Sequence, residues 1–104
     1  MTRRKIPCES DSSMEEYSEI SIETCTGYVY DDGTVKILGE AVTTDEIPID
    51  EYKTIQVILY DADGDIIDRH YTNWSEFGLR QSFKFEFGKF DETVAKIKVY
   101  PTNE

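Results

Sequence analysis

The sequence has one histidine and two cysteines, which is too little for most metal and nucleophile chemistry. Structural zinc sites gather Cys, His or carboxylate ligands at short, regular spacings. Neither Cys8 nor Cys25 has a second cysteine or a histidine at such an interval. His70 stands next to Arg69 in an alternating segment, with no nucleophile motif near it. We therefore predict no catalytic residues, no metal site and no cofactor, and we expect that the protein is not an enzyme.

Positive charge is also scarce, because 11 Lys and Arg stand against 22 Asp and Glu, a formal net charge of −11. Such a field repels the phosphate backbone of nucleic acids and the surface of anionic lipids. No apolar run approaches the ~20 residues of a membrane-spanning helix. We expect no nucleic-acid partner, no membrane insertion and a monomer. The acidity is explained by solubility, with adaptation to high salt as the alternative.

The N-terminal residues Met-Thr-Arg-Arg-Lys-Ile-Pro-Cys are basic but lack the apolar segment of a signal peptide. As written, the chain is expected in the cytoplasm, or outside the cell or on its surface if a leader has been removed. Residues 1–16 hold few apolar side chains, and we predict a disordered or loosely docked tail there. The spacing of Cys8 and Cys25 allows a disulfide but does not decide it.

From residue 17 to residue 104 the apolar residues recur with a period of two and never with a sustained helical period. Asp31-Asp32-Gly33 and Asp61-Ala62-Asp63-Gly64 are typical of tight turns between paired strands. We predict a single all-β domain, an immunoglobulin-like β-sandwich of six to seven antiparallel strands, with a small barrel as the alternative. The expected strands cover 20–30, 35–42, 55–60, 66–72, 83–87 and 94–100, with Phe83, Phe85 and Phe87 facing the core.

The segment Val57-Ile58-Leu59-Tyr60-Asp61, followed by Ala62-Asp63-Gly64-Asp65-Ile66-Ile67, resembles the signature of FxLYD-type domains. In that family an F-x-L-Y-D strand ends in an Asp/Gly turn, and here Val57 replaces the phenylalanine. The resemblance covers roughly residues 34–100. It implies an immunoglobulin-like, non-enzymatic accessory module, often found in surface or exported proteins.

Two kinds of binding site are open on the sequence. Tyr71 and Trp74 are candidates for contact with a protein or cell-surface partner, and this interaction module is the preferred interpretation. The alternative is a calcium or small-ligand site in the turn Asp61 to Asp68, whose alternating aspartates match the start of a calcium loop. That loop then has Ile66 where it needs glycine and Thr72 where it needs glutamate, so we predict a hairpin turn instead.

Overall fold

A computed structural model of the protein describes residues 2–88 and 93–103. The chain is mainly β-structure with one short helix, which confirms the all-β prediction. Within these residues the elements are β1 (Arg3–Glu9), α1 (Ser12–Ser18), β2 (Ile20–Tyr30), β3 (Val35–Thr43), β4 (Lys53–Tyr60), β5 (Ile66–Trp74), β6 (Arg80–Phe87) and β7 (Lys96–Thr102).

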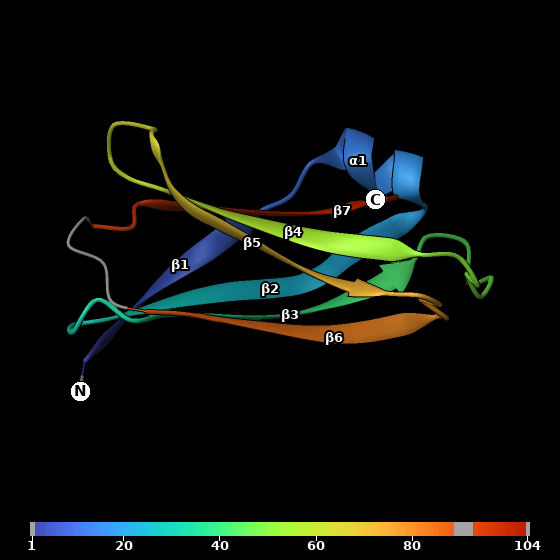
Figure 1. Ribbon diagram of the computed structural model, residues 1–104, viewed down its shortest axis with the longest axis horizontal. Helices are drawn as coiled ribbons and strands as arrows, with labels where there is room; N and C mark the ends of the chain where they lie inside the picture. Colours follow the sequence, from blue (N-terminus) through green and yellow to red (C-terminus); the bar gives the residue numbers. More distant parts are fainter. Residues whose placement is uncertain (1, 89–92, 104) are drawn as a thin grey trace.

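All seven of these strands form one sheet in the order β5-β4-β7-β1-β2-β3-β6. The sheet folds over on itself, so that β2, β3 and β6 lie opposite β4, β5 and β7, and β1 passes from one layer to the other (Figure 1). Residues Arg3–Pro7 of β1 pair antiparallel with β2, whereas Cys8 and Glu9 pair parallel with β7. The result is a nearly barrel-shaped sheet with β5 and β6 at its two edges.

The expected immunoglobulin-like arrangement of antiparallel strands is not confirmed. The contact between β1 and β7 is parallel, which differs from the prediction. Here β2 and β3 pair with each other along most of their length, from Ile20↔Thr43 to Val29↔Val35. β2 and β3 therefore lie in the same layer.

The N-terminal segment differs most from expectation. For residues 1–16 we predicted a disordered or loosely docked tail, yet they contain β1 and most of α1. Only Ile6 of β1 is fully buried, while Arg3, Arg4 and Lys5 are exposed, so the strand carries no alternating apolar signal. Its place in the sheet comes from backbone pairing with β2 and β7, which composition does not reveal.

The core lies between the two layers, where the alternating strands place their apolar side chains. Phe83, Phe85 and Phe87 are 5%, 7% and 4% exposed, which confirms the prediction that this stripe faces inward. β4 pairs with β5 on one side and β7 on the other, as its apolar residues on both faces indicated. Other fully buried members are Ile20, Val35, Ile37, Ile55, Val57, Leu59, Phe77, Ile97 and Val99.

Candidate functional site

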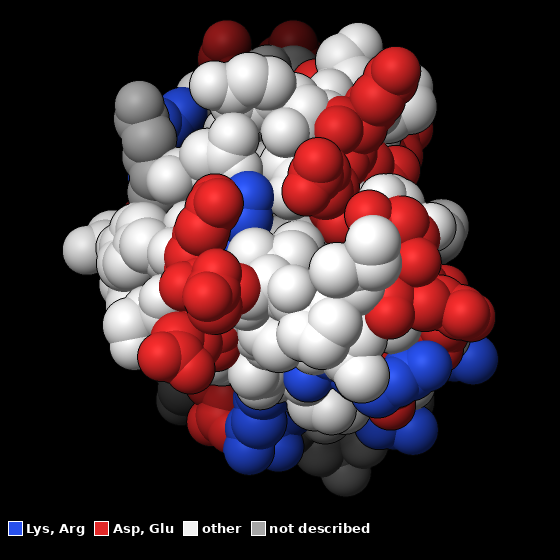
Figure 2. Space-filling model, turned by 90° about the vertical axis from the view of Figure 1, so that its right-hand side faces the viewer, with Lys and Arg blue, Asp and Glu red and all other residues white. Residues whose placement is uncertain are grey.

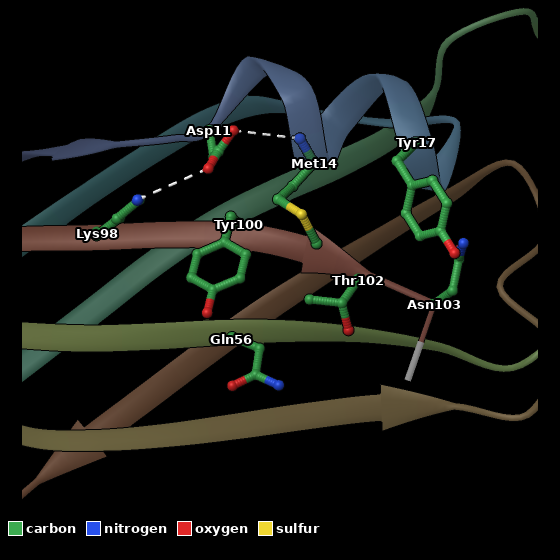
Figure 3. Close-up of a pocket in the computed structure, with 8 residues that line it drawn as sticks. All are labelled: Asp11, Met14, Tyr17, Gln56, Lys98, Tyr100, Thr102 and Asn103. Atoms are coloured by element: carbon green, nitrogen blue, oxygen red, sulfur yellow. Dashed lines mark hydrogen bonds and ion pairs between the residues drawn. The ribbon is translucent and has the colours of Figure 1, made fainter.

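A groove runs between α1 and the outer face of β4 and β7 (Figure 3). Asp11 fixes the start of the helix, because its Oδ1 accepts hydrogen bonds from the backbone N–H of Ser13 (3.0 Å) and Met14 (3.2 Å). The Oδ2 atom of the same carboxylate lies 3.7 Å from the Nζ of Lys98 on β7. One aspartate thus caps the helix and ties it to the sheet.

The walls of this groove combine polar and apolar side chains. Its volume is about 440 Å³, and its lining residues are Asp11, Met14, Tyr17, Gln56, Lys98, Tyr100, Thr102 and Asn103. Gln56 and Tyr100 are neighbours across β4 and β7, and Tyr17 lies beside Asn103 at the far end (Figure 3). Among the lining residues Asp11 is the one carboxylate, and it already caps the helix. The lining therefore lacks the pair of carboxylates that acid–base hydrolysis requires, although it offers hydroxyl and amide groups for hydrogen bonds.

A second hollow, of about 460 Å³, lies near the start of β6 and is lined by Glu23, Val42, Thr43, Glu46, Leu79 and Arg80. Nη1 of Arg80 is 2.8 Å from Oε1 of Glu23 and also contacts the carboxylate of Glu40. The hydrogen bond from Arg80 lowers the pKa of Glu23 below its usual range, and both carboxylates raise the pKa of Arg80. Two carboxylates neutralise this guanidinium, so it is poorly suited to bind an anion.

Three segments meet at one end of the molecule, which we call the loop end: the C-terminal part of α1 with its cap residue Glu19, residues 44–52 and residues 75–79 (Figure 1). Backbone hydrogen bonds join them. The N–H of Thr44 donates to the carbonyl of Glu19 (3.0 Å), and Ile49 and Gly78 exchange two bonds of 3.0 and 2.7 Å. The N–H of Thr43 donates to the carbonyl of Leu79 (3.1 Å). These bonds make the three segments one continuous surface.

The loop end exposes large apolar side chains between carboxylates. Tyr17, Ile47, Tyr52 and Leu79 are 69%, 61%, 46% and 50% exposed. Figure 2 looks onto this end and shows acidic groups in bands on either side of a mostly uncharged area, with basic groups below it. The exposed acids of the three segments are Glu16, Glu19, Asp45, Glu46, Asp50, Glu51 and Glu76. An apolar patch with a charged rim is the general form of a surface that binds another protein.

The two partner-binding candidates from the sequence do not lie together. Tyr71 is 63% exposed on the outer face of the edge strand β5. Trp74 lies on the opposite face of the same strand, half-buried against the core, with its ring 5.6 Å from that of Phe77 in an edge-to-face contact. Residues 75–79, which follow Trp74, do belong to the loop end. Sequence reasoning missed Ile47, and no local signal separates it from Ile49, which also adjoins Pro48 but is buried.

The turn between β4 and β5 is held by its first aspartate. Oδ1 of Asp61 accepts hydrogen bonds from the N–H of Asp63 (2.9 Å) and Asp65 (3.0 Å). Gly64 has φ +86°, a conformation that glycine adopts without strain. These bonds confirm the predicted hairpin turn. Across residues 2–88 and 93–103, no three His, Cys, Asp or Glu side chains gather closely enough to hold a metal ion.

His70, the one histidine, stands at the open edge between the layers. Its ring packs edge-on against Phe87 at 4.6 Å, and its Nε2 is 3.6 Å from the carboxylate of Asp68.

Comparisons with protein-family models, with curated proteins and with solved structures find no match to this chain. In the part of the chain that the structure describes, no helix is long and apolar enough to cross a membrane.

Proposed function

We propose that the protein is a non-enzymatic interaction module, and that it binds a basic, partly apolar segment of a protein partner through the loop end. The observation that carries this proposal is the gathering there of Tyr17, Ile47, Tyr52 and Leu79, four of the seven exposed large apolar side chains of the described chain. Burying such a patch against a partner is favourable because apolar area leaves water.

The rim of the patch determines the charge of the partner. Glu19, Glu46 and Glu76 come from the three different segments of the loop end and are all exposed. A partner segment with Lys or Arg on either side of its apolar residues would place opposite charges against this rim. Complementary charge of this kind speeds association and disfavours acidic competitors.

The resemblance to FxLYD-type domains supports the same function. We propose that the V-x-L-Y-D strand, which is β4 in the structure, marks this chain as an accessory module of that immunoglobulin-like kind. Its ligand would then be recognised outside the strands that carry the motif, since Val57 and Leu59 are fully buried and their roles are in packing.

Site-specific photo-crosslinking in a native lysate tests the location of the interface. A benzophenone amino acid replaces Ile47 in one variant and Leu38 in a matched control, because Leu38 is 43% exposed on β3, away from the loop end. We expect a discrete crosslinked protein from position 47 and none from position 38. Peptide mapping should place the crosslink in a segment rich in Lys or Arg. Equal labelling from both positions, or a crosslink to an acidic segment, would contradict the proposal.

Mutation provides the second test of the same interface. Leu79→Ser and Leu38→Ser remove side chains of the same type and similar exposure from the loop end and from β3. Binding of the captured partner should weaken on the order of tenfold in L79S, as for an interface residue worth more than about 1 kcal/mol, and stay unchanged in L38S. It should also weaken with added NaCl, because ions screen the charged rim.

A further inference from the structure

Two cysteines face each other across β1 and β2. The antiparallel register runs from Arg3↔Tyr30 to Pro7↔Thr26, and Cys8 and Cys25 are the next residues along the two strands. Directly opposed residues in such a pair have Cβ atoms about 4.5–5.5 Å apart and Cα atoms about 4.5–5.5 Å apart. A disulfide requires Cα atoms about 4.4–6.8 Å apart, and Cys8 and Cys25 stand one step past the last opposed pair, Pro7↔Thr26.

Both side chains point to the same face of the sheet. Ile6 and Gly27, the opposed pair two residues away, are buried on the inner face, and side chains alternate along a strand. Cys8 and Cys25 are accordingly half-buried and pack against the core, and both are free thiols. A hydrogen bond with Cys8 raises the pKa of the Cys25 thiol, and burial raises this pKa further. Their places on the two strands and their shared face make the two thiol groups neighbours.

We propose that Cys8 and Cys25 form a reversible redox pair, which closes to a cross-strand disulfide by exchange with a small-molecule disulfide such as oxidised glutathione. The thiolate of Cys8 attacks one sulfur of the oxidant, giving a mixed disulfide and releasing one glutathione thiolate. Cys25 then loses its proton and attacks Sγ of Cys8, and the second glutathione leaves as a thiolate. The chain gives up two protons and two electrons, and the oxidant becomes two thiols.

The order of attack follows from the state of the two thiols. The thiolate is the attacking form, and the raised pKa of Cys25 keeps this thiol protonated. Cys8 lies where β1 leaves β2 and joins β7, at the residue paired with Ile97. The second step is favoured because Cys25 is already held opposite the mixed disulfide, so the attack occurs within one molecule.

The disulfide would attach β1, the strand that passes from one layer to the other, to β2. The disulfide closes a loop of about 17 residues that contains α1. It stabilises the folded protein mainly because it restricts the conformations of the unfolded chain. The same segment is already attached to β7 by Glu9, whose carboxylate is 3.0 Å from Lys96, and by Asp11 beside Lys98. Oxidation should raise the Tm on the order of 10 °C.

The test uses the full chain, folded, in buffers of increasing oxidised-to-reduced glutathione ratio. Intact mass should show the loss of two hydrogen atoms with no glutathione retained, and peptide mapping should join Cys8 to Cys25. The Tm of the oxidised form should rise and return on reduction. In Cys25→Ser the exchange should stop with one glutathione on Cys8, and in the variant Cys8→Ser/Cys25→Ser the Tm should not respond to the ratio.

Three results would overturn the proposal. These are stable attachment of glutathione to both cysteines, disulfide-linked dimers as the main product, and an internal bond that forms only in denaturant. The last comparison uses the unmodified chain in native and denaturing buffer. It decides the matter even if the serine variants fail to fold, since a bond formed faster in the unfolded chain would show that the sheet holds the thiols apart.

Discussion

Gly39→Ala is expected to destabilise the protein, although replacing glycine by alanine inside a strand usually stabilises it. Gly39 lies in β3, opposite Cys25 of β2 and Phe83 of β6. A Cβ added there would stand 2.5 Å from the carbonyl oxygen of Thr24 and 2.5 Å from Cζ of Phe83. Ordinary contact begins at 3.4 Å, so two atoms on different strands must each move by about 0.9 Å. Moving the phenyl ring would disturb the core stripe, and moving the carbonyl would strain the pairing of β2 with β3.

The size of the effect is the difference of two opposing contributions. Overpacking a well-filled core costs about 1–3 kcal/mol, whereas replacing glycine stabilises by about 0.4–1 kcal/mol because the unfolded chain loses freedom. Destabilisation should win by about 1–2 kcal/mol. Urea unfolding followed by tryptophan fluorescence measures it, with Gly88→Ala as the control, because a Cβ at Gly88 meets nothing within 4 Å. A G39A variant as stable as the G88A variant would refute the packing argument.

Two further predictions concern the core stripe and the surface charges. Phe85→Ala should lower the free energy of unfolding in urea by about 3–5 kcal/mol, because Phe85 is only 7% exposed. The control Ser82→Ala, on the exposed face of the same strand, should lower it by less than about 0.5 kcal/mol. A loss below ~1 kcal/mol for F85A would mean that the stripe of Phe83, Phe85 and Phe87 is not part of the core. Glu23 has a pKa lowered by Arg80, so its contribution to stability is present above the ordinary glutamate pKa of 4.5 and is lost as the pH falls through its lowered value. The Tm difference between the native chain and Arg80→Gln should therefore shrink as the pH falls below 4.5, and a difference that stays constant with pH would contradict the ion pair.

The strands that bury one full face were predictable, because burial imposes a period of two on the sequence. Phe83, Phe85 and Phe87 alternate with exposed Ser82, Lys84 and Glu86, and the structure keeps this alternation. The two hairpins were predictable for a local reason as well. Asp32-Gly33 and Asp63-Gly64 supply the conformations that tight turns require, and both glycines have positive φ, 90° and 86°.

The first strand could not be predicted from its side chains. Ile6 is its one buried residue, and the remaining side chains are charged, half-buried or exposed. What holds β1 in the sheet is backbone pairing on both sides, together with contacts such as the hydrogen bond from Arg4 to the carbonyl of Val94 (3.0 Å), 90 residues away. Interactions between such distant residues leave no periodic pattern in the sequence, and the parallel contact of β1 with β7 is missed for the same reason.

The helix was missed because it is short. Its seven residues, Ser12–Ser18, span about two turns, which is below the length at which a helical period can be recognised. The sequence nevertheless contains a residue typical of a helix start, Asp11, whose carboxylate accepts hydrogen bonds from the first turn. The carboxylate of Glu15 accepts a further bond from the N–H of Ile22 at 2.6 Å. Read as a start signal, Asp-Ser-Ser would have indicated a helix inside the polar segment.

The position of the proposed interface follows from how the chain moves between its layers. The two tight hairpin turns, at 31–34 and 61–65, need only Asp and Gly and lie at one end of the molecule. Residues 44–52 and 75–79 instead lead from one layer to the other, across a core about 10 Å thick, and both do so at the loop end. Each of these connections buries one apolar residue, Ile49 or Phe77, and leaves another, Ile47 or Leu79, exposed. A partner bound there would contact both layers at once, and so its binding should also hold the two layers together.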